Sequence, residues 1–168
     1  MQDKESVFNG LVRQYSEQLY WHVRGIVGSH EDADDILQEV FIKAWNSLDG
    51  FRGDADLFTW LWRIATNESI SHLRKARVRA ALSFSRLDSE AARVSDPSPY
   101  FDGDAAMRSL RKAIAALPDK QRAVFTMRYW EELSYEQISE ITNTSVGALK
   151  ASYHFAYEKV KQFLTDTD

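Results

Sequence analysis

The stretch SYEQISEITNTSVGALKASYHF, residues 134–155, predicts two short helices joined by a tight turn. Ser134 is followed three residues later by Gln137, which is the pattern of a capping box at a helix start. Thr144 or Ser145 can cap a second helix soon after the first one ends. This spacing indicates a helix-turn-helix motif.

The second helix of the motif has apolar residues at steps of three and four, which places them on one buried face. These residues are Val146, Leu149, Tyr153, Ala156, Val160 and Phe163. Small residues on the opposite face allow the start of the helix to approach DNA closely. The predicted DNA-facing residues are Ser145, Gly147, Ala148, Lys150, Ala151, His154 and Phe155. A helical hairpin that binds no nucleic acid is the alternative interpretation of this motif alone.

The composition of the whole chain is that of a globular protein of 168 residues, with 44% hydrophobic and 27% charged residues. No apolar stretch approaches the roughly 18 residues that a membrane span needs. The first ten residues lack the pattern of a secretory signal, and the chain has no cysteine. We therefore expect a cytoplasmic protein that has no membrane insertion, disulfide or thiolate metal site.

The chain has three prolines and seven glycines, so long helices are allowed over most of its length. Alternating strand patterns are missing, and the expected fold is all-α. The expected helices span residues 6–27, 31–47, 57–78, 105–117, 119–130, 134–142 and 145–164.

Residues 80–107 separate two apolar-rich blocks and mix Ser, Asp, Pro and Gly with few periodic apolar positions. They contain 2 basic and 5 acidic residues, net −3, out of a net charge of −4 for the chain. We expect two small helical domains, 1–79 and 108–168, joined by this flexible acidic linker. A long loop inside one domain is the alternative.

The helix expected over 31–47 has one broad apolar face. Its second face carries acidic side chains around one apolar residue. Asp35, Gln38, Glu39 and Ile42 lie close together on this second face at 100° per residue. Such a surface would repel DNA but suits a basic protein surface. An ordinary solvated face is the alternative.

The helix expected over 57–78 places Arg63, Asn67 and Arg74 opposite its core stripe, flanked by Trp60 and Ser71. Cations suit phosphates, an amide suits a base edge, and an aromatic ring can stack on an unpaired base. A Gly- and Asp-rich loop that carries Phe51 precedes this helix. The alternative is a capped helix whose C-terminal cations only oppose its dipole.

The sequence gives little support for catalysis. The four histidines have no metal-ligand spacing, and the chain has no phosphate-binding glycine loop. We expect neither enzymatic activity nor a cofactor or metal site.

Three stretches together resemble the extracytoplasmic-function (ECF) sigma factors of the bacterial sigma-70 family. DADDILQEVFIKAW resembles the core-binding region, FRGDADLFTWLWRIATNESISHLRK resembles the region that melts and reads the −10 element, and residues 117–164 resemble the domain that reads the −35 element. The three occur in the family's order and cover nearly the whole chain.

The resemblance implies a transcription initiation factor that binds core RNA polymerase and promoter DNA, with a cognate anti-sigma factor. The clamp helices of the β′ subunit would contact Asp32, Asp35, Gln38, Glu39 and Ile42, and the β flap would hold the C-terminal domain. The implied −10 residues are Phe51, Arg52, Gly53, Asp54, Trp60, Arg63, Asn67, Ser71, Arg74 and Lys75.

Two rival functions remain open at this point. One is a ligand-responsive regulator with a C-terminal helix-turn-helix, and the other is a helical adaptor that binds only proteins. A regulator would bind its operator alone, whereas a sigma factor needs core polymerase.

Overall fold

The computed structural model describes residues 3–83 and 105–166, and every regular element within these two ranges is helical. The first range contains α1 (Lys4–Val27), α2 (His30–Ser47), the short 3₁₀ helix η1 (Leu48–Gly50) and α3 (Leu57–Leu82). The second contains α5 (Ala105–Ala115), α6 (Asp119–Phe125), η3 (Thr126–Trp130), α7 (Tyr135–Thr142) and α8 (Val146–Asp166). The expected all-α class is confirmed.

Local sequence signals explain where the helices begin and end. α1 stops at Gly28, which adopts φ +87° and donates its N–H to the carbonyl of Arg24. Glycine reaches this left-handed conformation without steric cost. Ser29 then caps α2 by accepting from the N–H of Asp32 at 3.1 Å. A turn of two residues therefore reverses the chain and pairs α1 with α2.

The capping box that the sequence predicts at α7 is present. Ser134 Oγ accepts from the N–H of Gln137, and Gln137 Oε1 accepts from the N–H of Ser134. α7 ends at Asn143, which adopts φ 55°. Of the two caps expected for α8, Ser145 makes the bond, because its Oγ accepts from the N–H of Ala148 at 3.2 Å.

The expected helix over 119–130 differs from the structure in its last five residues. η3 is a π-helical turn, in which the carbonyl of Thr126 accepts from the N–H of Glu131. A π turn inserts one extra residue per turn and rotates the side chains that follow it. This rotation lies directly before Glu131, which reaches into the first half of the molecule.

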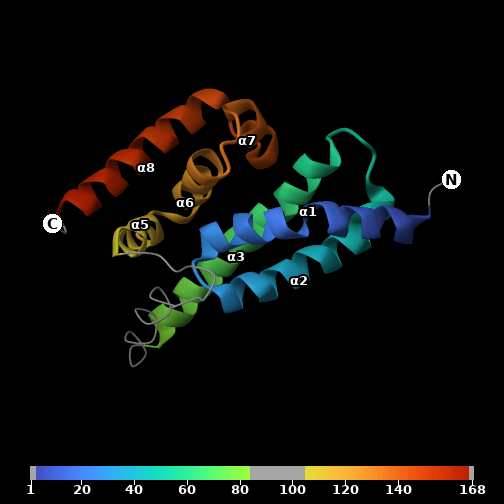
Figure 1. Cartoon of the computed structure of the whole chain (residues 1–168), viewed down its shortest axis with the longest axis horizontal. Helices are drawn as coiled ribbons and strands as arrows, with labels where there is room; N and C mark the ends of the chain where they lie inside the picture. The colour runs from blue at the N-terminus through green and yellow to red at the C-terminus, as the bar shows by residue number, and fades with distance from the viewer. Residues whose placement is uncertain (1–2, 84–104, 167–168) are drawn as a thin grey trace.

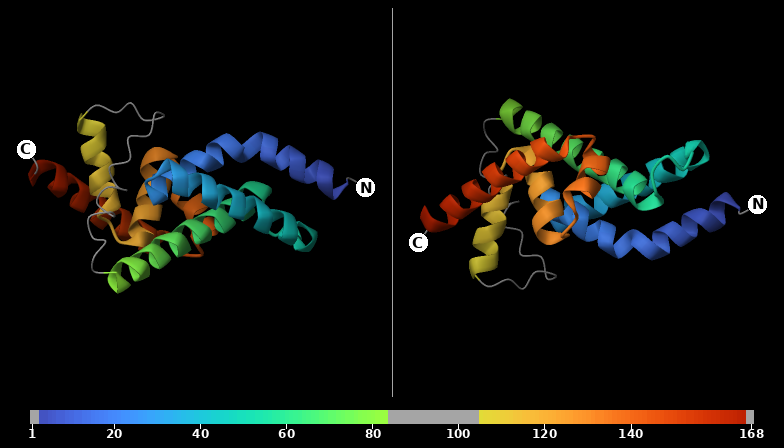
Figure 2. Two further views of the ribbon diagram at one scale, coloured as in Figure 1. Left: turned by 90° about the horizontal axis from the view of Figure 1, so that it is seen from below. Right: turned by 90° about the horizontal axis from the view of Figure 1, so that it is seen from above.

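The helices form two groups that pack against each other. α1, α2 and α3 form one bundle, and α6, η3 and α7 lie against α1 and α3. α8 runs along the outer side of the second group, and the start of α1 and the end of α8 lie at opposite ends of the molecule (Figures 1 and 2).

The main hydrophobic core extends across both groups. Trp62 of α3 is fully buried, and its ring stacks on Phe58 with centroids 4.1 Å apart. The same cluster of buried side chains includes Met127 and Ile138 from the second half. A smaller cluster lies between α5, α6 and α8, around Phe125. The two expected halves therefore share one apolar interface.

Most of the expected linker, residues 84–104 of 80–107, lies outside the described residues. Its first three residues belong to the end of α3 and its last three to the start of α5. Within the described ranges, no helix combines the length and apolar character needed to cross a bilayer.

Candidate nucleic-acid and protein interfaces

The acidic face of α2 lies on the surface. Asp35, Gln38, Glu39 and Ile42 are all exposed, and Ile42 exposes 53% of its area. The opposite face is buried against α1 and α3. One aliphatic side chain therefore lies exposed among carboxylates and an amide, outside the core.

Asp32 differs from the other predicted core-binding residues. Its side chain is 24% exposed, and its carboxylate lies 3.4 Å from Nε2 of His72 on α3. The position is therefore at the α2–α3 seam, beside the exposed face rather than in its centre. Further along the same seam, Lys43 pairs with Glu68, which raises the pKa of Lys43.

The loop between η1 and α3 holds two of the predicted aromatic residues against each other. The ring centroids of Phe51 and Trp60 are 5.4 Å apart, and Trp60 also packs on the main core. Both side chains are half-buried. Arg52 and Asp54 are exposed, and Gly53 between them has φ +80°. In this arrangement the two rings stabilise the loop.

Asp56 fixes the start of α3 after this loop. Its carboxylate accepts from the N–H of Thr59 at 2.7 Å, and this bond lowers the pKa of Asp56. The cap sets the direction in which the predicted −10 residues of α3 project. Arg63, Asn67, Arg74 and Lys75 are exposed, whereas Ser71 is half-buried.

One of these exposed residues already has a partner in the second half. Arg63 Nε donates to the carbonyl oxygen of Glu140 on α7 at 2.7 Å. Farther along α3, Arg77 pairs with Asp119 at the start of α6. The second half therefore covers part of the predicted DNA-binding face of α3 and leaves Asn67 exposed.

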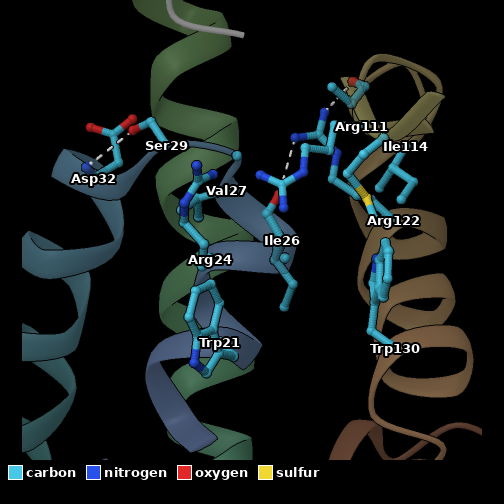
Figure 3. Close-up of a pocket in the computed structure, with 14 residues that line it drawn as sticks. Trp21, Arg24, Ile26, Val27, Ser29, Asp32, Arg111, Ile114, Arg122 and Trp130 are labelled. Carbon is cyan, nitrogen blue, oxygen red and sulfur yellow. Dashed lines mark hydrogen bonds between the residues drawn. The ribbon is translucent and has the colours of Figure 1, made fainter. Parts of the chain in front are cut away.

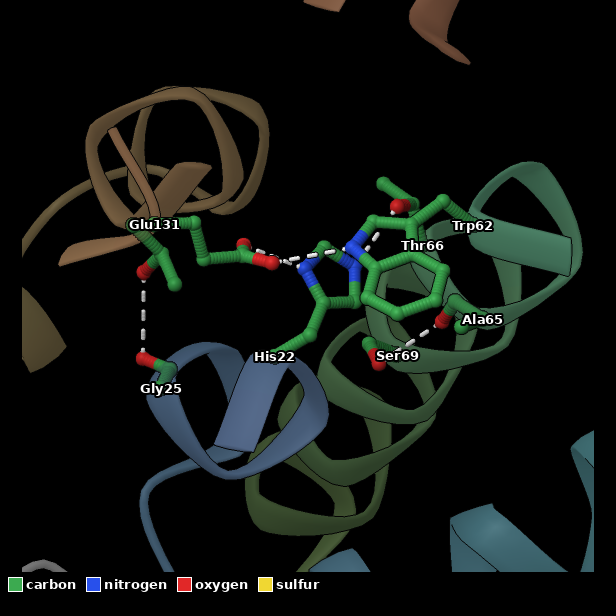
Figure 4. Close-up of polar contacts among 8 residues, drawn as sticks. His22, Gly25, Trp62, Ala65, Thr66, Ser69 and Glu131 are labelled. Carbon is green, nitrogen blue, oxygen red and sulfur yellow. Dashed lines mark hydrogen bonds and ion pairs between the residues drawn. The ribbon is translucent and has the colours of Figure 1, made fainter. Parts of the chain in front are cut away.

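A buried polar cluster joins the two halves next to this face (Figure 4). Glu131 Oε2 lies 2.6 Å from Nδ1 of His22, and Glu131 Oε1 accepts from Nε1 of Trp62 at 2.9 Å. The other ring nitrogen of His22, Nε2, is 2.9 Å from Oγ1 of Thr66. His22 has no exposed area. Each polar atom named here has a hydrogen-bond partner, as burial requires.

α1 and η3 approach each other closely beside this cluster. Thr126 Oγ1 donates to the carbonyl oxygen of Gly25 at 3.2 Å. A Cβ atom at residue 25 would lie 2.6 Å from Cγ2 of Thr126. Only glycine fits at residue 25 while the halves are packed in this way.

The predicted reading helix presents the expected residues to solvent. Leu149, Ala156 and Val160 of α8 are buried against the rest of the second half. The opposite face is exposed, with Phe155 at 58% of its area. It consists of Ser145, Gly147, Ala148, Lys150, Ala151, His154 and Phe155. Lys150 Nζ lies 5.8 Å from the ring centre of Tyr135.

Not every cation of the second half is available to phosphates. Arg108, Lys112 and Lys120 are exposed. The guanidinium of Arg122 instead donates to the carbonyls of Ile26 and Ala115 (Figure 3). Arg128 likewise donates to the carbonyl of Leu133. In this packed arrangement, both arginines therefore bind carbonyl oxygens of the protein itself.

Sequence reasoning missed the contacts between the halves. His22 lies among apolar residues of α1, and Glu131 lies in a short connection. Neither belongs to a motif, and their pairing depends on how distant helices pack. Among the described residues, no group of three or more His, Asp or Glu side chains is arranged to hold a metal ion.

Family models match both halves of the chain. The sigma-70 region 2 model matches residues 11–79, and the sigma-70 region 4 model matches residues 107–160. The chain is 33% identical to the ECF RNA polymerase sigma factor SigW of Bacillus subtilis over 175 residues, covering 96% of this chain and 91% of the relative. It is 32% identical to the ECF RNA polymerase sigma-E factor of Escherichia coli K12, covering 93% and 85%.

Solved structures share the fold. The sigma factor RpoE in complex with the anti-sigma factor NepR, from Bartonella quintana, aligns with a TM-score of 0.70 at 23% identity, over 94% of this chain and 96% of that one. CnrH in complex with the cytosolic domain of CnrY aligns with a TM-score of 0.68 at 24% identity, over 98% and 90%.

These comparisons support the sigma-factor interpretation and not the ligand-responsive regulator. The exposed acidic face of α2, the polar face of α3 and the helix-turn-helix of α7 and α8 lie within the two matched regions. The chain belongs to the ECF sigma factors of the sigma-70 family, which direct RNA polymerase to promoters in transcription initiation.

Proposed function

We propose that the chain binds the β′ clamp helices of core RNA polymerase through the exposed acidic face of α2. The observation that carries this proposal is the exposure of Asp35, Gln38, Glu39 and Ile42 on a helix whose other face is buried. Asp32 stands at the edge of this surface. Carboxylates around an exposed aliphatic residue fit a basic partner surface, and charge complementarity speeds encounter with it.

Promoter DNA is the second proposed partner. The exposed Asn67, Arg74 and Lys75 of α3, with Arg63 after its release from Glu140, would contact the −10 element. Ser71 and the Arg52–Asp54 loop complete this surface. Phe51 and Trp60 would take up an unpaired base only after their mutual contact loosens.

The start of α8 would enter the major groove at the −35 element. This face has only small side chains at Gly147, Ala148 and Ala151, so the helix backbone and Lys150 can approach the DNA closely. The β flap would hold the second half. Under this proposal, residues 1–79 and 108–168 act as separate units, and 80–107 connect them.

The packed arrangement is then the form of the chain that is not bound to polymerase. Promoter elements nearly two helical turns apart are separated by roughly 60 Å. In the packed arrangement α7 contacts both α3 and α8, so we expect these helices not to reach both elements while Glu131 bridges the two halves. Polymerase binding would separate the halves and expose Arg63. Relatives have been solved in complex with anti-sigma factors, and we propose a cognate anti-sigma factor here also.

The protein would act in the cytoplasm, where polymerase and DNA are, and would catalyse no bond change of its own. Its role is binding: it selects the promoter and holds the opened strand for the polymerase.

The test of the α2 surface is a charge reversal with a matched control. The double variant Asp35→Arg, Glu39→Arg should lose most of its affinity for core polymerase and keep its helical content, because both side chains are exposed. Glu5→Arg, Glu17→Arg makes the same charge change at exposed positions of α1. Equal binding of core by the two double variants would remove the proposed interface.

A further inference from the structure

The exposed face at the start of α8 is largely apolar. Gly147, Ala148 and Ala151 are exposed and have no side chain that can form a hydrogen bond, and Phe155 exposes 58% of its area. Ala148, Ala151 and Phe155 follow one another at steps of three and four, so they form one stripe along the helix. This apolar stripe faces away from the buried side of α8.

Lys150 lies at the flank of the apolar stripe. Its Nζ is 5.8 Å from the ring centre of Tyr135, the first residue of α7, and Figure 1 shows α7 beside the start of α8. In a helix-turn-helix the first helix crosses the DNA backbone, so a cation on that side meets phosphates. Phosphate contacts position the protein and carry no sequence information directly. Lys150 is therefore placed to bind the backbone instead of a base.

Few groups of this segment can form hydrogen bonds with a base edge. Amide side chains suit adenine, arginine suits guanine, and carboxylates suit cytosine. Residues 145–155 contain no Asn, Gln, Arg, Asp or Glu. Ser145 Oγ already accepts from the N–H of Ala148 at 3.2 Å. Apart from Lys150, the exposed nitrogen-bearing side chain here is His154, whose ring centroid lies 5.9 Å from that of Phe155.

An apolar stripe can still distinguish one base from the others. Thymine alone presents a methyl group in the major groove, and Ala and Phe side chains recognise it by apolar contact. We propose that α8 selects thymine in the −35 element through contacts of Ala148, Ala151 and Phe155 with this methyl group. The inference rests on the proposed function of α8 and adds the chemical group that the helix recognises.

The length of the apolar stripe limits how many bases it can contact. Ala148 and Phe155 are about 10 Å apart along the helix axis, and successive base pairs are about 3.4 Å apart. The next exposed residue near the centre of this face is Glu158, whose carboxylate the DNA phosphates repel. We therefore expect the stripe to face at most about three successive base pairs.

A promoter pool with random bases around −35 tests this expectation with the holoenzyme, formed from core polymerase and the full-length chain. The bound fraction should be enriched in thymine at up to about three neighbouring positions. Replacing each selected thymine by uracil then removes only the methyl group. Each replacement at a contacted position should weaken binding about fourfold, the effect of burying roughly one methyl group less.

Variants of α8 separate the methyl contact from the phosphate contact. Phe155→Ala should reduce the difference in affinity between thymine and uracil DNA, and Phe155→Leu should retain most of it, because leucine keeps an apolar side chain there. Phe155 is exposed, so both variants should fold. Lys150→Gln should weaken binding to thymine and uracil DNA equally and reduce the slope of log affinity against log salt by about one.

The matched control is Lys161→Gln, which removes another exposed cation of α8, roughly 16 Å farther along the helix than Lys150. It should change neither the thymine–uracil difference nor the salt slope. A thymine–uracil difference of parental size in Phe155→Ala would place the methyl contact elsewhere in the holoenzyme and overturn the inference.

The same experiment distinguishes failure of the inference from failure of the proposed function. Equal binding of thymine and uracil DNA by the parent, together with a clear preference for some other −35 sequence, would overturn the inference and leave the −35 role of α8 in place. If the holoenzyme shows no −35 preference, and Phe155→Ala and Lys150→Gln bind promoters as the parent does, both the −35 role of α8 and the inference are wrong.

Discussion

The carboxylate of Glu131 lies 2.6 Å from the buried ring of His22, although 109 residues separate them in sequence. The same carboxylate accepts a hydrogen bond from the indole of Trp62. One side chain from the second half therefore satisfies two buried polar groups of the first half. Removing it leaves both groups without this partner, and a buried polar group left unsatisfied costs about 1–3 kcal/mol.

Glu131→Ala should therefore shift the molecule toward separated halves. The chain has no cysteine, so labels can be attached at Arg79→Cys and Lys120→Cys, both exposed near the contact of Arg77 with Asp119. We expect the distance between the labels to increase and core polymerase to bind more tightly. Glu136→Ala, at an exposed position of α7, is the control. A label distance equal to that of the parent would show that the cluster does not hold the halves together.

Gly25→Ala tests the same interface by a steric route. The added Cβ would lie 2.6 Å from Cγ2 of Thr126, which is fully buried. Overpacking of this kind typically costs 1–3 kcal/mol. Thr126→Ser removes that methyl group and keeps the hydroxyl that bonds Gly25. The double variant should therefore regain most of the unfolding midpoint that Gly25→Ala loses, and failure of this rescue would argue against the close approach.

Local signals explain why so much of the helical architecture could be predicted from the sequence. Ser134 and Gln137 form their capping box between residues three apart, and the apolar stripe of α8 depends only on helix periodicity. The exposed acidic face of α2 follows from the same periodicity. These features need no knowledge of distant parts of the chain.

The contacts between the halves could not be predicted in this way. Arg122 appears in the sequence as one more surface cation, but the packing of α6 against α1 places its guanidinium on the carbonyl of Ile26. His22 is a polar residue on an apolar helix face, which periodicity cannot interpret. The π turn at η3 also has no clear sequence signal, although it precedes Glu131. These contacts depend on which helices pack against each other in the folded chain.

Acid should weaken the start of α3 through Asp56. The bond from Thr59 holds the pKa of Asp56 below its ordinary value. The stabilisation is therefore fully present above the unfolded pKa, near 4, and is lost as the pH falls through the lower folded pKa. Asp56→Ala should cost about 1 kcal/mol at pH 7, the usual value of such a cap. Denaturant unfolding should find a smaller difference from the parent below pH 3, and a constant difference would exclude this cap as the cause.

Two substitutions on α3, at Asn67 and at Trp60, should separate DNA binding from stability. Asn67 is exposed, so Asn67→Ala should change the free energy of unfolding by no more than about 0.5 kcal/mol. Trp60 packs on the core and on Phe51, so Trp60→Ala should cost about 2–4 kcal/mol. If Asn67 contacts the opened strand, its variant should form open complexes more slowly while polymerase binding is unchanged.

Permanganate reactivity of unpaired promoter thymines measures this step, and urea unfolding of the free protein measures stability. For Trp60→Ala, the two defects should appear together, because the loop of Phe51 loses its support. Glu68→Ala removes a half-buried side chain next to Asn67 that pairs with Lys43 instead of facing DNA, and serves as the control for α3. Parental thymine reactivity in Asn67→Ala would remove Asn67 from the proposed −10 surface, while a normal signal in a destabilised Trp60→Ala would assign Trp60 to packing alone.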